Sequence, residues 1–164
     1  DEDGEICISG PTVMKRYLDD PEETKKVLKR HSDGKIWLHT GDVGCMNKEG
    51  LVFFKSRLKR IIISSGYNIY PQYVEKVIMS YPSVSTCTVV GIPHPYKKQV
   101  PKAYIILREN FDDTEELRND IKEYCKKSIV KYSIPAEYEY VKELPKTLVG
   151  KVAFTKLGGC NGKK

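Results

Sequence analysis

The second half of the chain predicts an α+β fold, in which a small sheet packs with helices as a two-layer sandwich. Three observations support this: β-branched or alternating apolar runs of strand length, two stretches with apolar residues at helical spacing, and breaker residues between them. The first half has strand and turn patterns but too little apolar material for a core of its own. We therefore expect short β-strands from the edge of a larger domain to precede the sandwich.

The first fifty-odd residues contain one helix signal among several strand signals. Asp20 is a capping residue, Pro21 suits a first helical turn, and Glu23 follows three positions after the cap. The resulting helix is short and polar, and we expect it on the surface. The strands and the helix expected here span residues 5–9, 21–30, 36–42 and 51–54.

The second half has a more regular pattern, with apolar residues that define one face of each helix. In the longer helix, Asp113 is the expected cap and Glu116 completes a capping box. The apolar face of that helix consists of Leu117, Ile121, Tyr124, Cys125 and Ile129. The expected strands span 61–63, 84–92, 101–107 and 137–141, and the expected helices span 71–80 and 113–129.

The stretch from 56 to 71 joins a basic cluster, a strand, a tight turn and a helix start. Ile61 to Ile63 form a short run that we expect to be buried. Gly66 supplies backbone freedom, Asn68 tolerates a left-handed turn, and Pro71 suits the first position of a helix. Such an arrangement suits an anionic or extended ligand lying against exposed backbone, although a basic surface loop has the same features.

Composition narrows the class of protein. The chain has 164 residues, a net charge of +6 and 40% hydrophobic residues, which argues against intrinsic disorder. It has no apolar run of the length that a membrane helix needs and no signal-peptide pattern, so we expect no membrane span. Its tyrosines are spread out rather than forming a nucleic-acid platform, so we expect no nucleic-acid partner.

Five cysteines are scattered singly along the chain. An odd number without a close pair fits neither a disulfide framework nor a zinc site, and free thiols in the cytoplasm are the simpler expectation. The three histidines are also separated, so no metal site is expected. The residues concerned are Cys7, Cys45, Cys87, Cys125 and Cys160, with His31, His39 and His94.

Two charged residues are candidate ligand contacts, although each is more often an ordinary surface residue. Asp42 follows Thr40 and Gly41, and its carboxylate could accept hydrogen bonds from a sugar diol. Lys151 follows Gly150 in a loop that lacks the first glycine of a Walker phosphate-binding loop.

Taken together, several motifs resemble the C-terminal part of the adenylate-forming enzymes, which include acyl- and aryl-CoA synthetases, luciferases and peptide-synthetase adenylation domains. The resemblance runs from about Gly4 to Leu157, and the occurrence of the motifs in one order makes it specific. The motifs are WLHTGD at 37–42, RLK at 57–59, SSGYNIYP at 64–71, VGIPHP at 90–95, LPKT at 144–147 and GK at 150–151.

The resemblance implies a ligase that forms an acyl-adenylate from a carboxylic acid and ATP and then passes the acyl group to a thiol, usually that of CoA. Residues 1–57 would be the end of a large N-terminal domain, 58–60 a hinge, and 61–164 a mobile C-terminal domain. The serine-, threonine- and glycine-rich phosphate loop and the acyl pocket are not among these residues. Mg²⁺ would be required, with its ligands outside this chain, and the acyl substrate cannot be inferred.

The resemblance also assigns roles to individual residues. Asp42 and Arg57 match the positions that hold the ribose hydroxyls, and Lys59 matches the hinge. Lys151 matches the catalytic lysine that reaches the carboxylate and α-phosphate during adenylation. The segment formed by Ser65, Gly66 and Tyr67 matches the loop that lines the pantetheine tunnel.

Three residues depart from the family pattern. Ser65 stands where a second glycine is frequent, Val149 replaces a frequent threonine, and Arg60 replaces a frequent acid. The motif at 38–42 and the lysine hinge favour a CoA ligase. We expect that ligase to be cytoplasmic and to act in fatty acid metabolism. Two alternatives remain: a peptide-synthetase adenylation domain that acts on a carrier-protein thiol, and a stand-alone module that only binds a partner.

Overall fold

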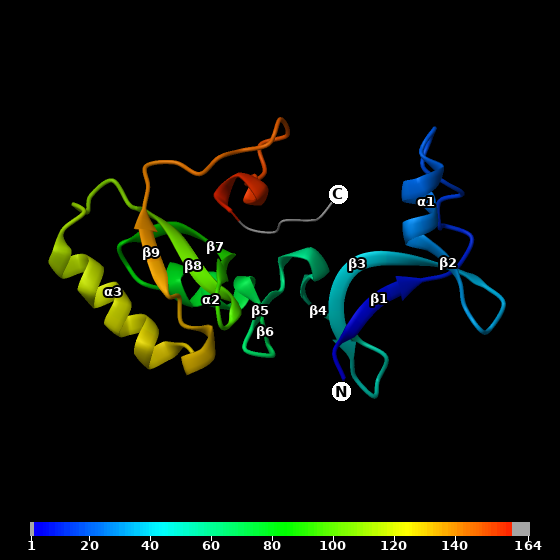
Figure 1. Ribbon diagram of the computed structural model, residues 1–164, viewed down its shortest axis with the longest axis horizontal. Helices are drawn as coiled ribbons and strands as arrows, with labels where there is room; N and C mark the ends of the chain where they lie inside the picture. Colours follow the sequence, from blue (N-terminus) through cyan, green and yellow to red (C-terminus); the bar gives the residue numbers. More distant parts are fainter. Residues whose placement is uncertain (1, 159–164) are drawn as a thin grey trace. The chain divides into compact units, whose positions relative to one another are not determined.

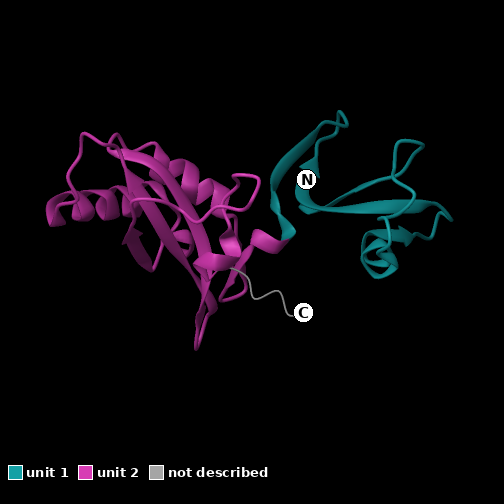
Figure 2. Ribbon diagram, turned by 90° about the horizontal axis from the view of Figure 1, so that it is seen from above, with its two compact units in different colours: residues 1–58 teal, residues 59–164 magenta. Residues whose placement is uncertain are grey.

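The computed structural model describes residues 2–158, which form two compact units (Figure 2). Unit 1 ends at Leu58 and unit 2 begins at Lys59. Within residues 2–158, no helix is long and apolar enough to cross a membrane. The predicted free thiol of Cys160 lies outside the described residues.

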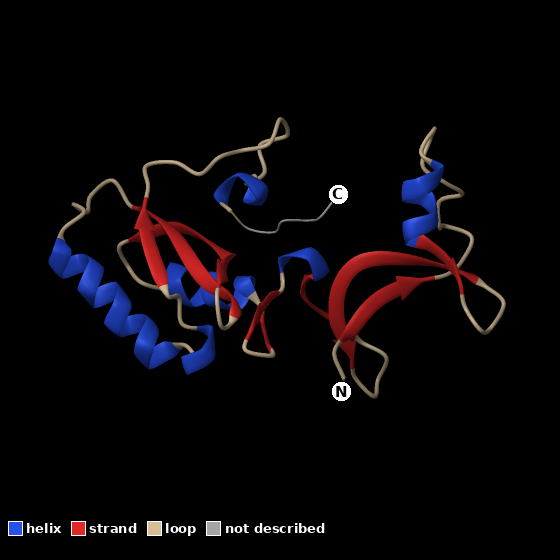
Figure 3. Ribbon diagram, in the orientation of Figure 1, coloured by secondary structure: helices blue, strands red, loops and turns tan. Residues whose placement is uncertain are grey.

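Unit 1 is a four-stranded antiparallel sheet with one short helix (Figure 3). The long strand β3 lies at its centre and pairs with all three other strands. The elements are β1 (Gly4–Ile8), α1 (Pro21–Val27), β2 (Leu28–Arg30), β3 (Ile36–Met46) and β4 (Val52–Arg57).

The helix predicted over residues 21–30 is three residues too long. Asp20 caps it as expected, with its Oδ1 2.9 Å from the Glu23 N–H, but α1 ends at Val27. Leu28 to Arg30 instead form β2 and pair with β3. A seven-residue helix with no buried residue has little to hold its last turn, so strand pairing prevails there.

Unit 1 has a thin apolar interior. Val43 is the one buried hydrophobic residue among those described in this unit. Phe53 and Phe54 on β4 are 51% and 52% exposed. The sheet therefore presents apolar surface that unit 1 does not cover by itself.

Unit 2 is the predicted α+β sandwich. Its sheet has the order β6-β5-β8-β7, with β9 parallel to β8 and the other pairs antiparallel (Figure 3). The strands are β5 (Ile62–Ser64), β6 (Tyr67–Ile69), β7 (Val84–His94), β8 (Lys98–Leu107) and β9 (Glu137–Tyr140). The helices are α2 (Pro71–Met79) and α3 (Glu115–Ser128), with short helical turns at Lys131–Ser133 and Phe154–Leu157. A further helical turn, Leu58–Arg60, spans the boundary between the two units.

Both helices pack on one face of this sheet, as the helical spacing predicted. Because successive strand residues point to opposite faces, alternate residues in the middle of β7 and β8 contribute to this core. The cluster comprises Val74 and Ile78 of α2, Ile121 and Cys125 of α3, and Ile62, Ile69, Cys87, Val89, Ala103 and Ile105 of the sheet, with Val84 and Ile129.

The opposite face of the sheet is covered by the C-terminal segment, which the sequence did not predict. Val90 and Tyr104 alternate with the helix-facing residues and pack with Leu144, Val152 and Phe154. The Tyr104 hydroxyl donates to the Leu157 carbonyl at 3.1 Å. Beyond the Val141 N–H, which donates to the Ile105 carbonyl, the described part of the segment after β9 is attached to the sheet through side chains.

The tight turn after the isoleucine run is a two-residue hairpin between β5 and β6. Both of its residues have positive φ, 49° at Ser65 and 86° at Gly66, as in a type I′ turn. The prediction of a left-handed Asn68 is wrong, because Asn68 lies in β6 opposite Ile63. The isoleucine run is also not uniformly buried, since Ile63 is 36% exposed on the outer side of the pleat.

The predicted cap of the long helix is displaced by one residue. Thr114 is the N-cap, and its Oγ1 accepts from the Leu117 N–H at 3.2 Å. Asp113 instead forms a two-point ion pair with Arg118. Both residue types cap well, and the arginine five positions on selects between them.

Neighbouring isoleucines in β5 provide a test of this packing. Ile62 is 2% exposed and Ile63 is 36% exposed. Ile62→Ala should lower the free energy of unfolding of unit 2 by about 2–5 kcal/mol, because it leaves a cavity among fixed neighbours. Ile63→Ala should cost about 1 kcal/mol or less. Urea unfolding followed by far-UV circular dichroism measures both; equal losses would contradict the assigned faces.

Candidate functional site

The structure brings together the two residues predicted to hold a ribose. Asp42 on β3 and Arg57 on β4 are directly opposite partners in the antiparallel ladder. Arg57 Nε lies 2.7 Å from Asp42 Oδ1, while the Arg57 side chain remains 61% exposed. The pair therefore offers an oriented carboxylate beside an accessible guanidinium, which suits a ligand with both hydroxyl and anionic groups.

A turn stabilised by β1 positions Asp42. Gly41 has a φ of +72°, and its N–H donates to Glu5 Oε1 at 3.0 Å. The Thr40 hydroxyl donates to the Ile6 carbonyl at 2.7 Å and accepts from the Asp42 N–H at 3.1 Å. Burial raises the pKa of the Glu5 carboxyl, but hydrogen bonds from His39 and the Gly41 N–H lower the pKa overall. Glu5 is thus a charged support of this turn.

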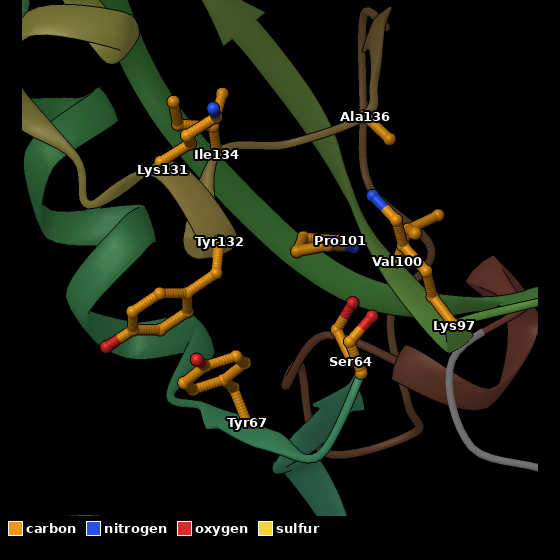
Figure 4. A pocket seen from close by; sticks show the side chains of 10 residues that line it. Ser64, Tyr67, Lys97, Val100, Pro101, Lys131, Tyr132, Ile134 and Ala136 are labelled. Atoms are coloured by element: carbon orange, nitrogen blue, oxygen red, sulfur yellow. The ribbon is translucent and has the colours of Figure 1, made fainter.

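In unit 2, the predicted pantetheine loop borders an open pocket of about 420 Å³ (Figure 4). Ser65 and Tyr67 line it, whereas Gly66 has no atom within 4 Å of the position that a Cβ would occupy. The Ser65 N–H donates to the Lys97 carbonyl at 3.0 Å, which attaches the loop to the β7–β8 hairpin. The loop is exposed, and bare backbone lies at its tip.

The pocket combines aromatic rings with lysines. Tyr67 and Tyr132 are stacked with their ring centroids 4.7 Å apart, and the two rings lie together on one side of the pocket in Figure 4. Lys97 and Lys131 contribute two ammonium groups to the lining. Sequence reasoning missed this pocket, because its residues come from three separate segments. Such a lining suits a ligand that carries phosphate groups.

Lys151 lies in a narrow loop after β9, between residues that pair across it. Its N–H is 3.2 Å from Thr147 Oγ1, and its carbonyl accepts from the Thr147 N–H at 2.7 Å. Gly150 supports the turn with a φ of +80°. Val149, which replaces a frequent threonine, is 79% exposed. The hydroxyl that accepts a hydrogen bond from the Lys151 N–H is that of Thr147. The backbone of the loop is held while the Lys151 residue is exposed.

The loop containing Lys151 and the β5–β6 turn project from opposite sides of unit 2 (Figure 1). The first lies between β9 and the final helical turn, and the second lies at the tip of the short hairpin. Unit 2 therefore carries two separate functional candidates that face different directions.

Arg60 has a partner that the sequence did not reveal. Arg60 forms an ion pair with Glu75 of α2, whose side chain is 10% exposed. Glu75 Oε1 also accepts from the Val89 N–H at 2.8 Å. The Arg60 guanidinium lies 4.0 Å from the centroid of the Phe154 ring. This arginine therefore connects the segment that contains Lys59 with the C-terminal segment that contains Lys151.

The buried thiols and phenols of unit 2 are unsuited to acid–base chemistry near neutral pH. Burial raises the pKa of Cys87, Cys125, Tyr138 and Tyr140, which favours their neutral forms. The described cysteines are free thiols, with Cys87 and Cys125 inside the helix-facing core. A packing role accounts for both of them.

Comparison with known proteins defines the class. Residues 73–151 match the family described as the AMP-binding enzyme C-terminal domain. This part of the chain belongs to that family. The predicted resemblance is therefore confirmed.

Individual relatives point the same way. A long-chain-fatty-acid–CoA ligase of Bacillus subtilis (strain 168) is 42% identical over 95% of this chain and 26% of its own length. A peroxisomal butyrate–CoA ligase of Arabidopsis thaliana is 36% identical over 94% of this chain and 26% of its own. The chain is also similar to the solved structure of o-succinylbenzoate CoA synthetase from Bacillus subtilis in complex with an acyl-adenylate intermediate. The two superpose with a TM-score of 0.81 and 33% sequence identity, over 97% of this chain and 31% of the synthetase chain. The chain thus spans about a quarter of the curated relatives that it matches.

The Arg60–Glu75 ion pair gives a prediction for stability. Glu75→Ala should lower the free energy of unfolding of unit 2 by about 3–5 kcal/mol, because it removes one member of a buried pair and leaves a charge uncompensated. Glu123→Ala, which removes an exposed i,i+3 pair with Lys126, should change stability little. Urea unfolding of both variants measures the difference; a Glu75 effect as small as that of Glu123 would exclude the anchoring role.

Proposed function

We propose that this chain is the C-terminal portion of an ATP-dependent acyl-CoA synthetase. The observation that carries the proposal is the presence, on one compact unit of the AMP-binding C-terminal family, of a lysine loop and a glycine turn on opposite sides. The names of its relatives as CoA ligases support CoA, and structural neighbours solved with bound ATP support ATP, as the substrates that accompany a carboxylic acid.

Two chemical steps require different groups. In the first, the carboxylate attacks the α-phosphorus of ATP and pyrophosphate leaves. We assign Lys151 to the stabilisation of the charge on the carboxylate and phosphoryl oxygens, as the catalytic lysine of this step. Asp42 would accept hydrogen bonds from the ribose hydroxyls while Arg57 holds it in place. In the second step, the CoA thiolate attacks the acyl carbon and AMP leaves.

The second step calls for close approach of the thiol, and the β5–β6 turn is our candidate for it. Ser65, Gly66 and Tyr67 would line the path of pantetheine, with Gly66 providing bare backbone. Between the two steps, the β5–β6 turn would replace the Lys151 loop at the reacting groups. This exchange would occur by rotation of residues 61–164 about a hinge at 58–60 centred on Lys59. Residues 1–57 would belong to the large N-terminal domain, whose remaining part would cover Phe53 and Phe54. That domain would also supply the Mg²⁺ ligands, and we propose a cytoplasmic location.

Separate measurement of the two half-reactions tests the assignment. In the whole protein that carries this chain, Lys151→Ala should slow adenylate formation by roughly a hundredfold or more and spare thioester formation from supplied acyl-adenylate. Gly66→Leu should do the reverse, because a side chain would obstruct the thiol. Pyrophosphate release measures the first step, and acyl-CoA formation measures the second.

Matched variants separate these effects from general damage. Lys156→Ala removes another lysine of the same C-terminal segment and should leave both steps near the parental rates. Gly50→Leu introduces the same backbone strain at a glycine with a φ of +82° and open surroundings, away from the turn. If Lys151→Ala and Gly66→Leu impair the same step to the same degree, the two-face mechanism is wrong.

The lysines that line the pocket allow a test of whether the acyl acceptor is free CoA or, as in the alternative, a carrier-protein thiol. The carrier presents pantetheine without the nucleotide of CoA, so only free CoA brings additional phosphates to Lys97 and Lys131. Lys131→Ala should raise the KM for CoA about 10- to 100-fold, the usual range for loss of a charged hydrogen bond, with adenylate formation unchanged. Lys127→Ala is the control, as an exposed lysine of α3 outside the pocket lining. An unchanged KM would favour the carrier-protein alternative.

A further inference from the structure

Unit 1 contains a cluster of three metal-ligand side chains where β1 pairs with β3. Glu5 and Cys7 are two positions apart on β1, on either side of an irregularity in its pairing with β3, and their ligand atoms lie close together. His39 lies directly opposite Cys7 in the ladder. His39 Nδ1 is 2.7 Å from Glu5 Oε2 and 3.6 Å from Cys7 Sγ. One ligand atom from each of the three residues lies within 4.8 Å of the other two.

These three groups together favour a zinc ion over a hard cation such as Mg²⁺. A thiolate, an imidazole nitrogen and a carboxylate oxygen are the protein ligands of zinc, and sites with three protein ligands leave a fourth position for water. The side chains of His39 and Glu5 are 16% and 26% exposed, so the cluster is shielded yet reachable from solvent. A hard cation such as Mg²⁺ prefers an all-oxygen set, which the cluster does not provide.

Neighbouring groups hold two of the three ligands in orientation. His39 Nε2 lies 3.0 Å from His31 Nε2, a contact that requires one proton between the two rings. When His39 carries that proton, its Nδ1 lone pair points toward Glu5 and Cys7. The His31 ring stacks on Trp37, with the ring centroids 5.6 Å apart. Glu5 is fixed through its other oxygen by the Gly41 N–H at 3.0 Å. Histidine ligands of metals commonly donate their second ring N–H in this way.

A simpler interpretation treats the cluster as a hydrogen bond between His39 and Glu5. A proton between Nδ1 and Oε2 explains their 2.7 Å separation, but it gives no role to Cys7. With that proton on Nδ1, His39 Nε2 would accept a hydrogen bond from His31, so the His31 contact fits either arrangement. A shared cation also accounts for the position of the Cys7 thiol beside His39 Nδ1.

We propose that Glu5, Cys7 and His39 bind one zinc-class divalent metal ion, with His31 as a positioning residue. The ion would join β1 to β3 beside the turn that carries Asp42. This departs from the sequence-based expectation of no metal site. The proposal is independent of the ligase function, since its ligands lie in unit 1 and its test does not use activity.

Direct metal binding to the full chain provides the first test. Zn²⁺, competed against a chromophoric chelator, should bind with one high-affinity site per chain. Co²⁺ should give a thiolate-to-metal charge-transfer band in the near ultraviolet. Cys7→Ser, Glu5→Gln and His39→Gln should each weaken Zn²⁺ binding by about tenfold or more, and Cys7→Ser should abolish the Co²⁺ band. Cys45→Ser, which changes the other half-buried cysteine of unit 1, should retain both properties.

Two His31 variants test its positioning role. His31→Phe keeps a ring beside Trp37 but removes the hydrogen-bond acceptor, and it should weaken Zn²⁺ binding about 10- to 100-fold. His31→Gln restores an acceptor and should recover part of that loss. The thiolate-to-Co²⁺ band should persist in both variants, because His31 is not a ligand. Equal affinities in the two variants would show that His31 only packs against Trp37.

A measurement on the unaltered protein avoids dependence on variant folding. Zn²⁺ should slow alkylation of Cys7 by iodoacetamide and leave Cys45 unaffected, as read by mass spectrometry of the peptides. Absence of Cys7 protection together with absence of the Co²⁺ band would overturn the metal site. So would a Zn²⁺ affinity that is the same in Cys7→Ser and Cys45→Ser.

Discussion

The arrangement of unit 2 depends on the two interactions that the buried Glu75 carboxylate makes. It accepts a hydrogen bond from the Val89 N–H and forms an ion pair with Arg60, so one buried charge joins α2, β7 and the segment after Leu58. Arg60 in turn lies over the Phe154 ring. A buried carboxylate that lost either partner would be left poorly compensated, which makes these connections mutually dependent.

This connection has a consequence for the candidate catalytic lysine. Within residues 141–158, the segment that carries Lys151 forms an isolated β-bridge between Lys146 and Val152 inside the loop itself, and only its first residue, Val141, hydrogen-bonds to the backbone of β8, at Ile105. Its attachment comes from Leu144, Phe154 and their neighbours on the outer sheet face. The loop is therefore held at its base by packing, while its tip is free to meet a ligand.

Unit 1 follows a different principle, because hydrogen bonds rather than core burial fix its functional turn. Gly41 and Thr40 are held by Glu5 and Ile6 of β1, and Asp42 is placed opposite Arg57 by the register of β3 and β4. The apolar side chains of β4 remain exposed in this unit. The polar framework of the turn is thus complete within unit 1, whereas its apolar surface is not covered there.

The sequence alone determined the fold class, the order of the main elements and the family. Helical spacing in 117–129 and alternation in 84–107 depend on local periodicity, which any core of this type must satisfy. Turn chemistry likewise identified the bend at Gly66, although it placed the left-handed partner at Asn68 instead of Ser65. Element ends were less predictable: strand pairing with β3 ended α1 at Val27.

Only the tertiary structure decided which distant residues meet. The Arg60–Glu75 pair, the pocket lined by Tyr67 and Tyr132, and the cluster of Glu5 with His39 each join residues that lie far apart in sequence. Their spacing leaves no local periodic signal, because sheet register and packing between segments set the contacts. The same reason explains why His31 and His39 looked unrelated in the sequence. β3 and the preceding turn place their Nε2 atoms 3.0 Å apart.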